Sequence, residues 1–103
     1  MKSTARAVVN GGGVVGVSTL YHLAKMGWSD VVLLERKELT SGSTWHAAGL
    51  LPLFNLSYSV GKLHQYSVGL YPTLEAETGL HAGFSQVTNI RLATTKDRMD
   101  EYN

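Results

Sequence analysis

A cluster of glycines near the start of the chain constrains the fold more than any other feature. Gly11, Gly13 and Gly16 form the pattern G-x-G-x-x-G. The pattern follows a short apolar run at residues 5–9 and opens a stretch in which apolar residues recur at helical spacing. A second apolar run lies at residues 31–34. Strand, helix and strand within about 30 residues make a βαβ unit. The sequence therefore predicts two buried parallel strands joined by a right-handed helical crossover.

Glycine and proline residues indicate where the elements after the first apolar stretch end or bend. Gly27 ends the helical spacing, as a glycine following a helix does. Residues 36–55 are rich in Ser, Thr, Gly and Ala without a clear period, which indicates an ordered loop with a short helical turn. Residues 56–77 predict a helix, and Pro72 inside it is expected to kink or split that helix.

The C-terminal third of the chain predicts a hairpin and a last helix. Phe84–Val87 and Ile90–Thr94 flank the pair Thr88-Asn89, which is typical of two short strands joined by a turn. Thr95 is placed to cap the N-terminus of a helix that begins at Lys96.

The glycine pattern has a specific chemical interpretation in this context. Gly11 permits a tight turn, Gly13 lets the backbone approach a pyrophosphate, and Gly16 lets the helix pack closely on the strand. Glu35 ends the second apolar run about 20 residues later, where a carboxylate accepts hydrogen bonds from a ribose 2′-hydroxyl and repels a 2′-phosphate. The pattern therefore predicts a dinucleotide site at the N-terminus of the first helix. Arg36 is either a contact of the adenosine half or a solvated charge.

The sequence of the segment after the second strand distinguishes an NAD-binding domain from an FAD-binding one. An NAD domain normally continues with further βα units, whereas residues 41–50 read S-G-S-T-W-H-A-A-G-L. Small residues and hydroxyls suit a backbone wrapped against a flat ring system. By residue chemistry alone, His46 is more often a hydrogen-bonded loop histidine than a reactive one. Trp45 is more often a packing residue than a stacking partner.

Composition excludes several classes of function. Nine basic and eight acidic residues leave a net charge of +1, too little for a dedicated nucleic-acid binder. The chain has no cysteine, and its four histidines show no metal-ligand spacing, so no metal site is predicted. The longest apolar run is too short to cross a membrane, and no transit peptide is seen. No residue of the chain is assigned a catalytic role.

The segment S-G-S-T-W-H-A-A-G-L, just after L-L-E-R, resembles the dimethylglycine dehydrogenase and sarcosine dehydrogenase family of D-amino-acid-oxidase-type flavoproteins. The resemblance runs from Arg6 to the C-terminus and includes N-I-R-L-A-T-T. It implies an α/β fold in which a Rossmann-like βαβ unit for FAD is followed by a helix and a short β-hairpin. It also implies that residues 1–103 are the N-terminal part of an FAD-binding oxidoreductase domain, truncated here, with FAD attached covalently through His46. The predicted cofactor-binding residues are Gly11, Gly13, Val14, Val15, Gly16, Glu35, Arg36, Gly42, Ser43, Thr44, Trp45, His46, Ala47, Ala48, Gly49 and Leu50.

The resemblance also implies an activity for a longer parent protein. Members of the family oxidise N-methylated glycines, so a small N-methylated amine is the expected substrate. Folate and an electron-transfer flavoprotein are expected to act through regions outside this chain, and the catalytic residues are expected there too. The fragment alone is expected to be inactive. The expected location is the cytoplasm of a bacterium or the mitochondrial matrix of a eukaryote.

Two alternatives from other classes stay open. One is a non-catalytic regulatory relative of the same fold, similar to the pyruvate dehydrogenase phosphatase regulatory subunit. The other is an NAD-binding Rossmann module, which would need a third βα unit.

Asn10 departs from the Ile or Val expected at the end of the first strand. In a sheet covered on both faces this side chain is buried, and a buried amide without partners costs about 1–3 kcal/mol. We therefore expect Asn10 to be a locally unfavourable choice.

Overall fold

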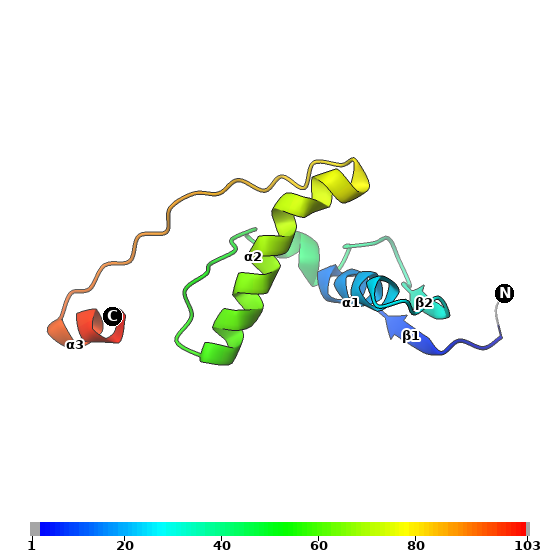
Figure 1. Cartoon of the computed structure of the whole chain (residues 1–103), viewed down its shortest axis with the longest axis horizontal. Coiled ribbons are helices and arrows are strands. Elements are labelled where there is room, and N and C mark those ends of the chain that lie inside the picture. Colours follow the sequence, from blue (N-terminus) through cyan, green and yellow to red (C-terminus); the bar gives the residue numbers. More distant parts are fainter. Residues whose placement is uncertain (1–2, 103) are drawn as a thin grey trace. The chain divides into compact units, whose positions relative to one another are not determined.

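The computed structural model describes residues 3–102 and forms two compact units. The N-terminal unit comprises Met1–Leu50, and the C-terminal unit comprises Leu51–Asn103. In the N-terminal unit, β1 (Ala7–Asn10) is followed by α1 (Val14–Lys25) and β2 (Val31–Leu34) (Figure 1). This order confirms the βαβ unit that the glycine pattern and the two apolar runs predict.

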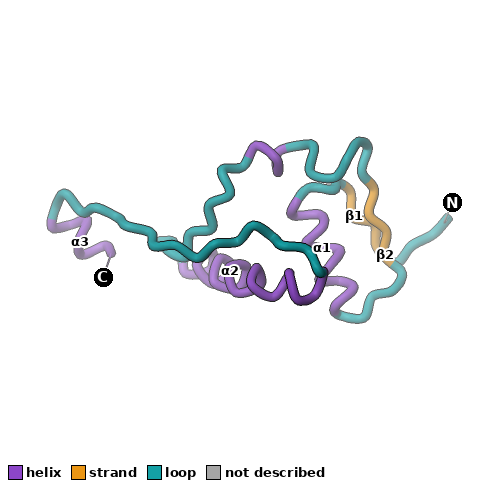
Figure 2. The backbone as a smooth tube through the Cα atoms, turned by 90° about the horizontal axis from the view of Figure 1, so that it is seen from above, coloured by secondary structure: helices purple, strands orange, loops and turns teal. Residues whose placement is uncertain are grey.

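The two strands of the N-terminal unit pair in parallel. Their register runs from Ala7 opposite Val31 to Asn10 opposite Leu34. Figure 2 shows the strands side by side with α1 next to them, and α1 contacts both. The helix crossover thus brings the carboxyl ends of β1 and β2 to one edge of the sheet, next to the start of α1.

The predicted burial of the strands is only partly correct. No apolar side chain of residues 3–102 is fully buried, and Val8 and Leu34 are 56% and 54% exposed. Parallel strands become buried when helices cover both faces of their sheet, and α1 covers only one face here. Asn10 is exposed for the same reason. The expectation that its amide is buried is therefore wrong for this structure.

The C-terminal end of α1 is a complete Schellman motif. Gly27 adopts a left-handed conformation with φ of +85°. Its N–H donates to the carbonyl of Ala24, and the N–H of Trp28 donates to the carbonyl of Leu23. The sequence prediction that Gly27 ends this helix is confirmed. The 3-10 turn η1 (Ser43–His46) likewise confirms the short helical turn expected in the loop after β2.

The long helix of the C-terminal unit is α2 (Tyr58–Thr78). It begins after Ser57 and ends at Gly79, whose φ of +72° is left-handed. Pro72 lies inside the helix without splitting it. Figure 1 shows the helix axis bending toward its yellow C-terminal part, the direction of effect that an interior proline has on a helix.

The predicted hairpin is wrong. Residues 80–94 contain neither strand nor bridge, and Val87, Ile90 and Leu92 are each about four-fifths exposed. An isolated two-stranded hairpin is marginal in water and needs a third strand or a helix to cover its apolar face. Thr88-Asn89 also lacks the glycine that tight two-residue hairpin turns favour. The segment is extended, as its β-branched residues favour, but it has no pairing partner among the described residues.

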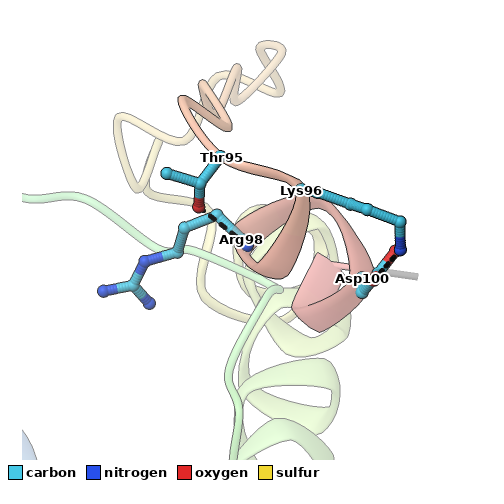
Figure 3. Close-up of polar contacts among 4 residues, drawn as sticks. All are labelled: Thr95, Lys96, Arg98 and Asp100. Atoms are coloured by element: carbon cyan, nitrogen blue, oxygen red, sulfur yellow. Dashed lines mark hydrogen bonds and ion pairs between the residues drawn. The ribbon is translucent and has the colours of Figure 1, made fainter.

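The last helix, α3 (Lys96–Tyr102), begins where the sequence predicts. The N–H of Arg98 donates to the hydroxyl oxygen of Thr95 at 3.3 Å, which makes Thr95 the N-terminal cap (Figure 3). Lys96 and Asp100 form an ion pair one turn apart, also drawn in Figure 3. Both side chains are largely exposed, so the pair adds little to stability.

Candidate cofactor-binding site

Two glycines of the loop between β1 and α1 are required by backbone geometry. Gly11 has φ of +109°, a conformation that side-chain-bearing residues rarely adopt. A Cβ on Gly16 would lie 1.8 Å from the carbonyl oxygen of Gly11, so α1 approaches the loop too closely for any side chain. The N–H of Gly11 donates to the carbonyl of Leu34 at 2.8 Å. The turn is therefore tied directly to the end of β2.

The peptide of Gly12 is held on both sides by the loop that follows β2. Its N–H donates to Oε2 of Glu35 at 2.7 Å, and its carbonyl accepts from the N–H of Thr40 at 2.9 Å. A Cβ on Gly12 would lie 2.5 Å from a methyl carbon of Leu39. The G-x-G-x-x-G pattern predicts no role for Gly12, and no motif predicts one for Thr40. The run of three glycines was the available signal for Gly12, whereas Thr40, with φ of +66°, had none.

Glu35 is an oriented carboxylate at the carboxyl end of β2. Its second oxygen, Oε1, accepts from the N–H of Lys37 at 2.9 Å. The N–H groups of Gly12 and Lys37 lower the pKa of Glu35 below its ordinary value of 4.5, while partial burial opposes them. The charge of Arg36 adds a smaller lowering. Because each carboxylate oxygen accepts more than one hydrogen bond, Glu35 retains acceptor capacity for ribose hydroxyls.

The N-terminus of α1 meets the η1 turn. Gly13 is the N-cap residue of α1 and has no side chain to cap it. The N–H of Val14 donates instead to the hydroxyl oxygen of Thr44 at 2.9 Å. A Cβ on Gly13 would lie 2.9 Å from that same hydroxyl oxygen. The absence of a side chain at position 13 thus makes room for Thr44.

His46 is an exposed histidine at the end of η1. Its Nδ1 lies 3.0 Å from the carbonyl oxygen of Gly42. Since a carbonyl only accepts, this bond places a proton on Nδ1 and leaves Nε2 of the neutral ring with its lone pair. The ring of Trp45 packs beside that of His46, with centroids 5.0 Å apart, while Trp45 itself is 68% exposed.

An open cavity of about 390 Å³ lies beside the N-terminus of α1 and Glu35. It is lined by the glycine loop, the first turn of α1, Glu35 and residues 42–44, together with Val9, Asn10 and Thr19. The structure thus brings nine of the predicted cofactor-binding residues to one place: Gly11, Gly13, Val14, Val15, Gly16, Glu35, Gly42, Ser43 and Thr44. Arg36 and residues 45–50 do not line the cavity.

The cavity has the chemistry of a site for the adenosine diphosphate half of a dinucleotide. Helix N–H groups at the start of α1 suit phosphate oxygens, and the glycine backbone at positions 11 and 13 carries no side chain that would keep a pyrophosphate away. Glu35 stands at the carboxyl end of β2, where a ribose is expected. Among residues 3–102, no cluster of three or more potential metal ligands occurs. No helix in the described part of the chain is long and apolar enough to span a membrane.

A parallel βαβ unit with a glycine loop and a terminal carboxylate defines a dinucleotide-binding domain. Within that class, residues 6–103 match the family described as "DAO: FAD dependent oxidoreductase". The match covers almost the whole chain, so the chain belongs to this family of FAD-dependent oxidoreductases. Membership in an FAD-dependent family shows that the NAD-binding alternative is wrong.

Relatives within the family identify the branch to which the chain is similar. It is 56% identical over 101 residues to "Dimethylglycine dehydrogenase, mitochondrial" of Rattus norvegicus, which covers 98% of this chain and 12% of that protein. It is 50% identical over 103 residues to "Sarcosine dehydrogenase, mitochondrial" of Homo sapiens, covering 99% of this chain and 11% of that protein. The chain therefore spans about one-eighth of the length of these relatives.

A solved structure supports the fold. The crystal structure of glycine oxidase from Bacillus cereus matches this chain with a TM-score of 0.71 and 27% sequence identity. The match covers 94% of this chain and 28% of glycine oxidase. The mixed α/β arrangement with an N-terminal strand–helix–strand unit is thus the FAD-binding fold of an oxidoreductase.

Proposed function

We propose that residues 1–103 are the N-terminal part of the FAD-binding domain of an enzyme that oxidises N-methylated glycines. The observation that carries the proposal is the meeting of the α1 N-terminus and Glu35 at one cavity. The similarity to dimethylglycine and sarcosine dehydrogenases supports the amine class of substrate. We also propose that the substrate-binding and catalytic groups lie outside this chain and that the fragment alone is inactive; the coverage of only 12% of the dimethylglycine dehydrogenase relative supports this.

Each end of the cavity has a distinct role in this proposal. The N–H group of Val15, in the first turn of α1, would bind the pyrophosphate, and Glu35 would bind the ribose of the adenosine half. In this proposal residues 42–50 would hold the isoalloxazine end of FAD. When bound, FAD supplies the two-electron acceptor for the substrate. The chain's own residues bind and orient it.

We further propose that FAD is attached covalently to His46. The Nδ1–H bond to Gly42 leaves Nε2 as the ring nitrogen with a lone pair, which is the form of the ring that a bond to the flavin 8α carbon requires. Forming that link would replace one C–H bond of the 8α carbon by a bond to Nε2, release one proton from that carbon and one from the imidazole ring, and pass two electrons to the electron acceptor that reoxidises the flavin. The His46 ring and Glu35 belong to different ends of the site. Covalent attachment and binding of the adenosine half can therefore be tested separately.

The replacement His46→Ala in the full-length protein tests the attachment. We expect it to abolish flavin fluorescence in the acid-precipitated protein while FAD remains in the supernatant, because the glycine loop and Glu35 bind the other end of the cofactor. His81→Ala is the matched control, since His81 lies in the C-terminal unit and its ring accepts a local hydrogen bond from the N–H of Gly83. Pellet fluorescence equal to wild type after His46→Ala would move the attachment to another residue.

Substrate, partners and location are part of the same proposal. We propose dimethylglycine or sarcosine as substrate, with folate and an electron-transfer flavoprotein acting through other regions. We propose a mitochondrial matrix location in a eukaryote, since the relatives are named as mitochondrial, and a cytoplasmic one in a bacterium. Anaerobic bleaching of the flavin absorbance by each amine separates the two substrates. A full-length protein that holds flavin but is bleached by neither amine would instead be a non-catalytic relative.

A further inference from the structure

The hydroxyl of Thr44 connects the two halves of the cavity. The N–H of Val14 is among the first N–H groups of α1, which have no partner inside the helix. Its partner is Oγ1 of Thr44, 30 positions away in sequence, at 2.9 Å. The bond joins the phosphate-binding end of α1 to a turn that follows β2.

That turn also carries His46. Thr44 and His46 belong to the same four-residue 3-10 turn, η1. The turn is closed by the bond from the N–H of Ala47 to the carbonyl of Thr44 and by the contact of the His46 ring with the carbonyl of Gly42. Because these bonds are internal to the turn, a shift of Thr44 moves His46 with it.

The next contact between this loop and the glycine loop lies four residues earlier. It is the bond from the N–H of Thr40 to the carbonyl of Gly12. Residues 41 and 42, between Thr40 and η1, are exposed. The Thr40 bond lies outside η1, whereas the Thr44 bond joins η1 itself to the start of α1.

We propose that Thr44 is a positioning residue, whose hydroxyl holds η1 against the N-terminus of α1 and thereby places His46 for attachment of the flavin. The attachment itself rests on the function proposed above.

Two full-length variants and a control separate this role from a general structural one. Thr44→Val keeps the shape of the side chain and removes the hydroxyl, whereas Thr44→Ser keeps the hydroxyl and removes a methyl group. Ser41→Ala removes a hydroxyl from the exposed part of the same loop, outside the predicted site. Each protein is produced flavin-free under riboflavin limitation.

The first measurement is hydrogen–deuterium exchange of the flavin-free proteins. We expect Thr44→Val to raise exchange in residues 13–15 and 43–47, and Thr44→Ser and Ser41→Ala to behave as wild type. The second is the rate at which added FAD becomes acid-stable. We expect Thr44→Val to slow it by about two- to tenfold, the fold-change for one lost hydrogen bond, and Thr44→Ser to restore it.

Affinity for FAD is measured in a His46→Ala background, where binding is expected to be reversible. A change below about twofold on adding Thr44→Val agrees with a positioning role. Unchanged exchange after Thr44→Val overturns the proposal, as does raised exchange with an unchanged attachment rate. Failure of Thr44→Ser to restore the rate overturns it too. Absence of acid-stable flavin in the wild type overturns the covalent attachment, and the hold of Thr44 on η1 is then decided by exchange alone.

Discussion

The two units differ in the kind of interaction that joins distant parts of the chain: side-chain hydrogen bonds in the N-terminal unit, and ring contacts such as Phe54 with Tyr102 in the C-terminal unit. In the N-terminal unit, hydrogen bonds join Gly12 to Glu35 and Val14 to Thr44, which are 23 and 30 positions apart. In the C-terminal unit, side-chain hydrogen bonds such as that from Ser67 to Leu63 stay within one helical turn. A substitution in the N-terminal unit is therefore expected to change stability through residues that are distant in the sequence. A substitution at an α2 position without a ring contact such as that of Tyr71 with Phe84 changes stability mainly through helix propensity.

The largest contrast is expected from adding one methyl group at Gly16. In Gly16→Ala the new Cβ meets the Gly11 carbonyl oxygen at 1.8 Å, so α1 or the glycine loop must shift. We expect a loss of at least about 3 kcal/mol of unfolding free energy, the upper range for overpacking, and no retained FAD. Thermal melts and flavin content of the purified full-length protein measure both effects. A variant with normal flavin content would show that the close approach is not needed.

The next effect concerns the carboxylate that links the two loops. Glu35→Ala removes the acceptor for Gly12 and, in the proposed complex, for the ribose. We expect FAD binding to weaken about 5- to 150-fold, the range for a lost charge-assisted hydrogen bond. Titration of the flavin-free full-length protein with FAD measures the change. Glu38→Ala is the control, because Glu38 lies in the same loop outside the cavity. An unchanged dissociation constant would make Glu35 a strand-end surface residue.

The lowered pKa of Glu35 predicts that the free energy of unfolding depends on pH. The folded-state pKa of Glu35 is lowered below 4.5. The ionised carboxylate therefore contributes fully to the free energy of unfolding at a pH above its unfolded-state pKa. That contribution is lost as the pH falls through its lower folded-state pKa. Wild type is expected to lose more stability than Glu35→Gln on acidification below pH 4.5. Urea unfolding midpoints across that interval test this, and parallel curves for the two proteins would contradict it.

A smaller effect is expected at Thr40. Its φ of +66° is costly for a β-branched residue, by about 1–2 kcal/mol. Thr40→Gly removes that cost but adds about 0.5–1 kcal/mol of unfolded-state entropy. The net gain is expected to be at most about 1.5 kcal/mol. Thr40→Ala keeps a Cβ and is expected to gain less. Melting temperatures of the two variants, compared in one buffer, decide whether the strain is present.

The smallest effect is expected in the C-terminal unit. Gly69 lies inside α2, and a Cβ there would meet nothing within 4 Å. Gly69→Ala is therefore expected to stabilise the helix by about 0.5–1 kcal/mol. The opposite signs for Gly16→Ala and Gly69→Ala would confirm the contrast between the units. A destabilising Gly69→Ala would mean that another surface packs against this part of α2 in the full-length protein.

The sequence predicts features that depend on local patterns. The βαβ unit follows from two continuous apolar runs and from glycines whose spacing has a steric reason, and Gly27 and Thr95 mark helix ends through bonds to nearby residues. The hairpin at residues 84–94 was wrong because pairing depends on a third partner, which the pattern does not contain. The exposure of Asn10 was missed because burial depends on what covers the second face of the sheet.

The candidate site was predictable only in part. The glycines and Glu35 occur at a spacing that reflects one βα crossover, so their meeting at one cavity was foreseeable. The contacts of Thr40 and Thr44 depend on the path of a loop without periodicity, and no pattern in residues 36–46 predicts that path. The roles of individual residues toward FAD stay predictions until the variants above are measured.

The two-stranded sheet has a consequence for handling the polypeptide. In the described residues β1 and β2 pair only with each other, so each strand has one outer edge of unpaired N–H and C=O groups. Such edges are templates for strand addition by other chains, and exposed Val8 and Leu34 add apolar surface beside them. Residues 1–103 prepared alone are therefore expected to associate as their concentration rises. The edges that would recruit foreign chains are also the places where further strands of a larger domain would add, so solubility and completion of the sheet are governed by the same groups.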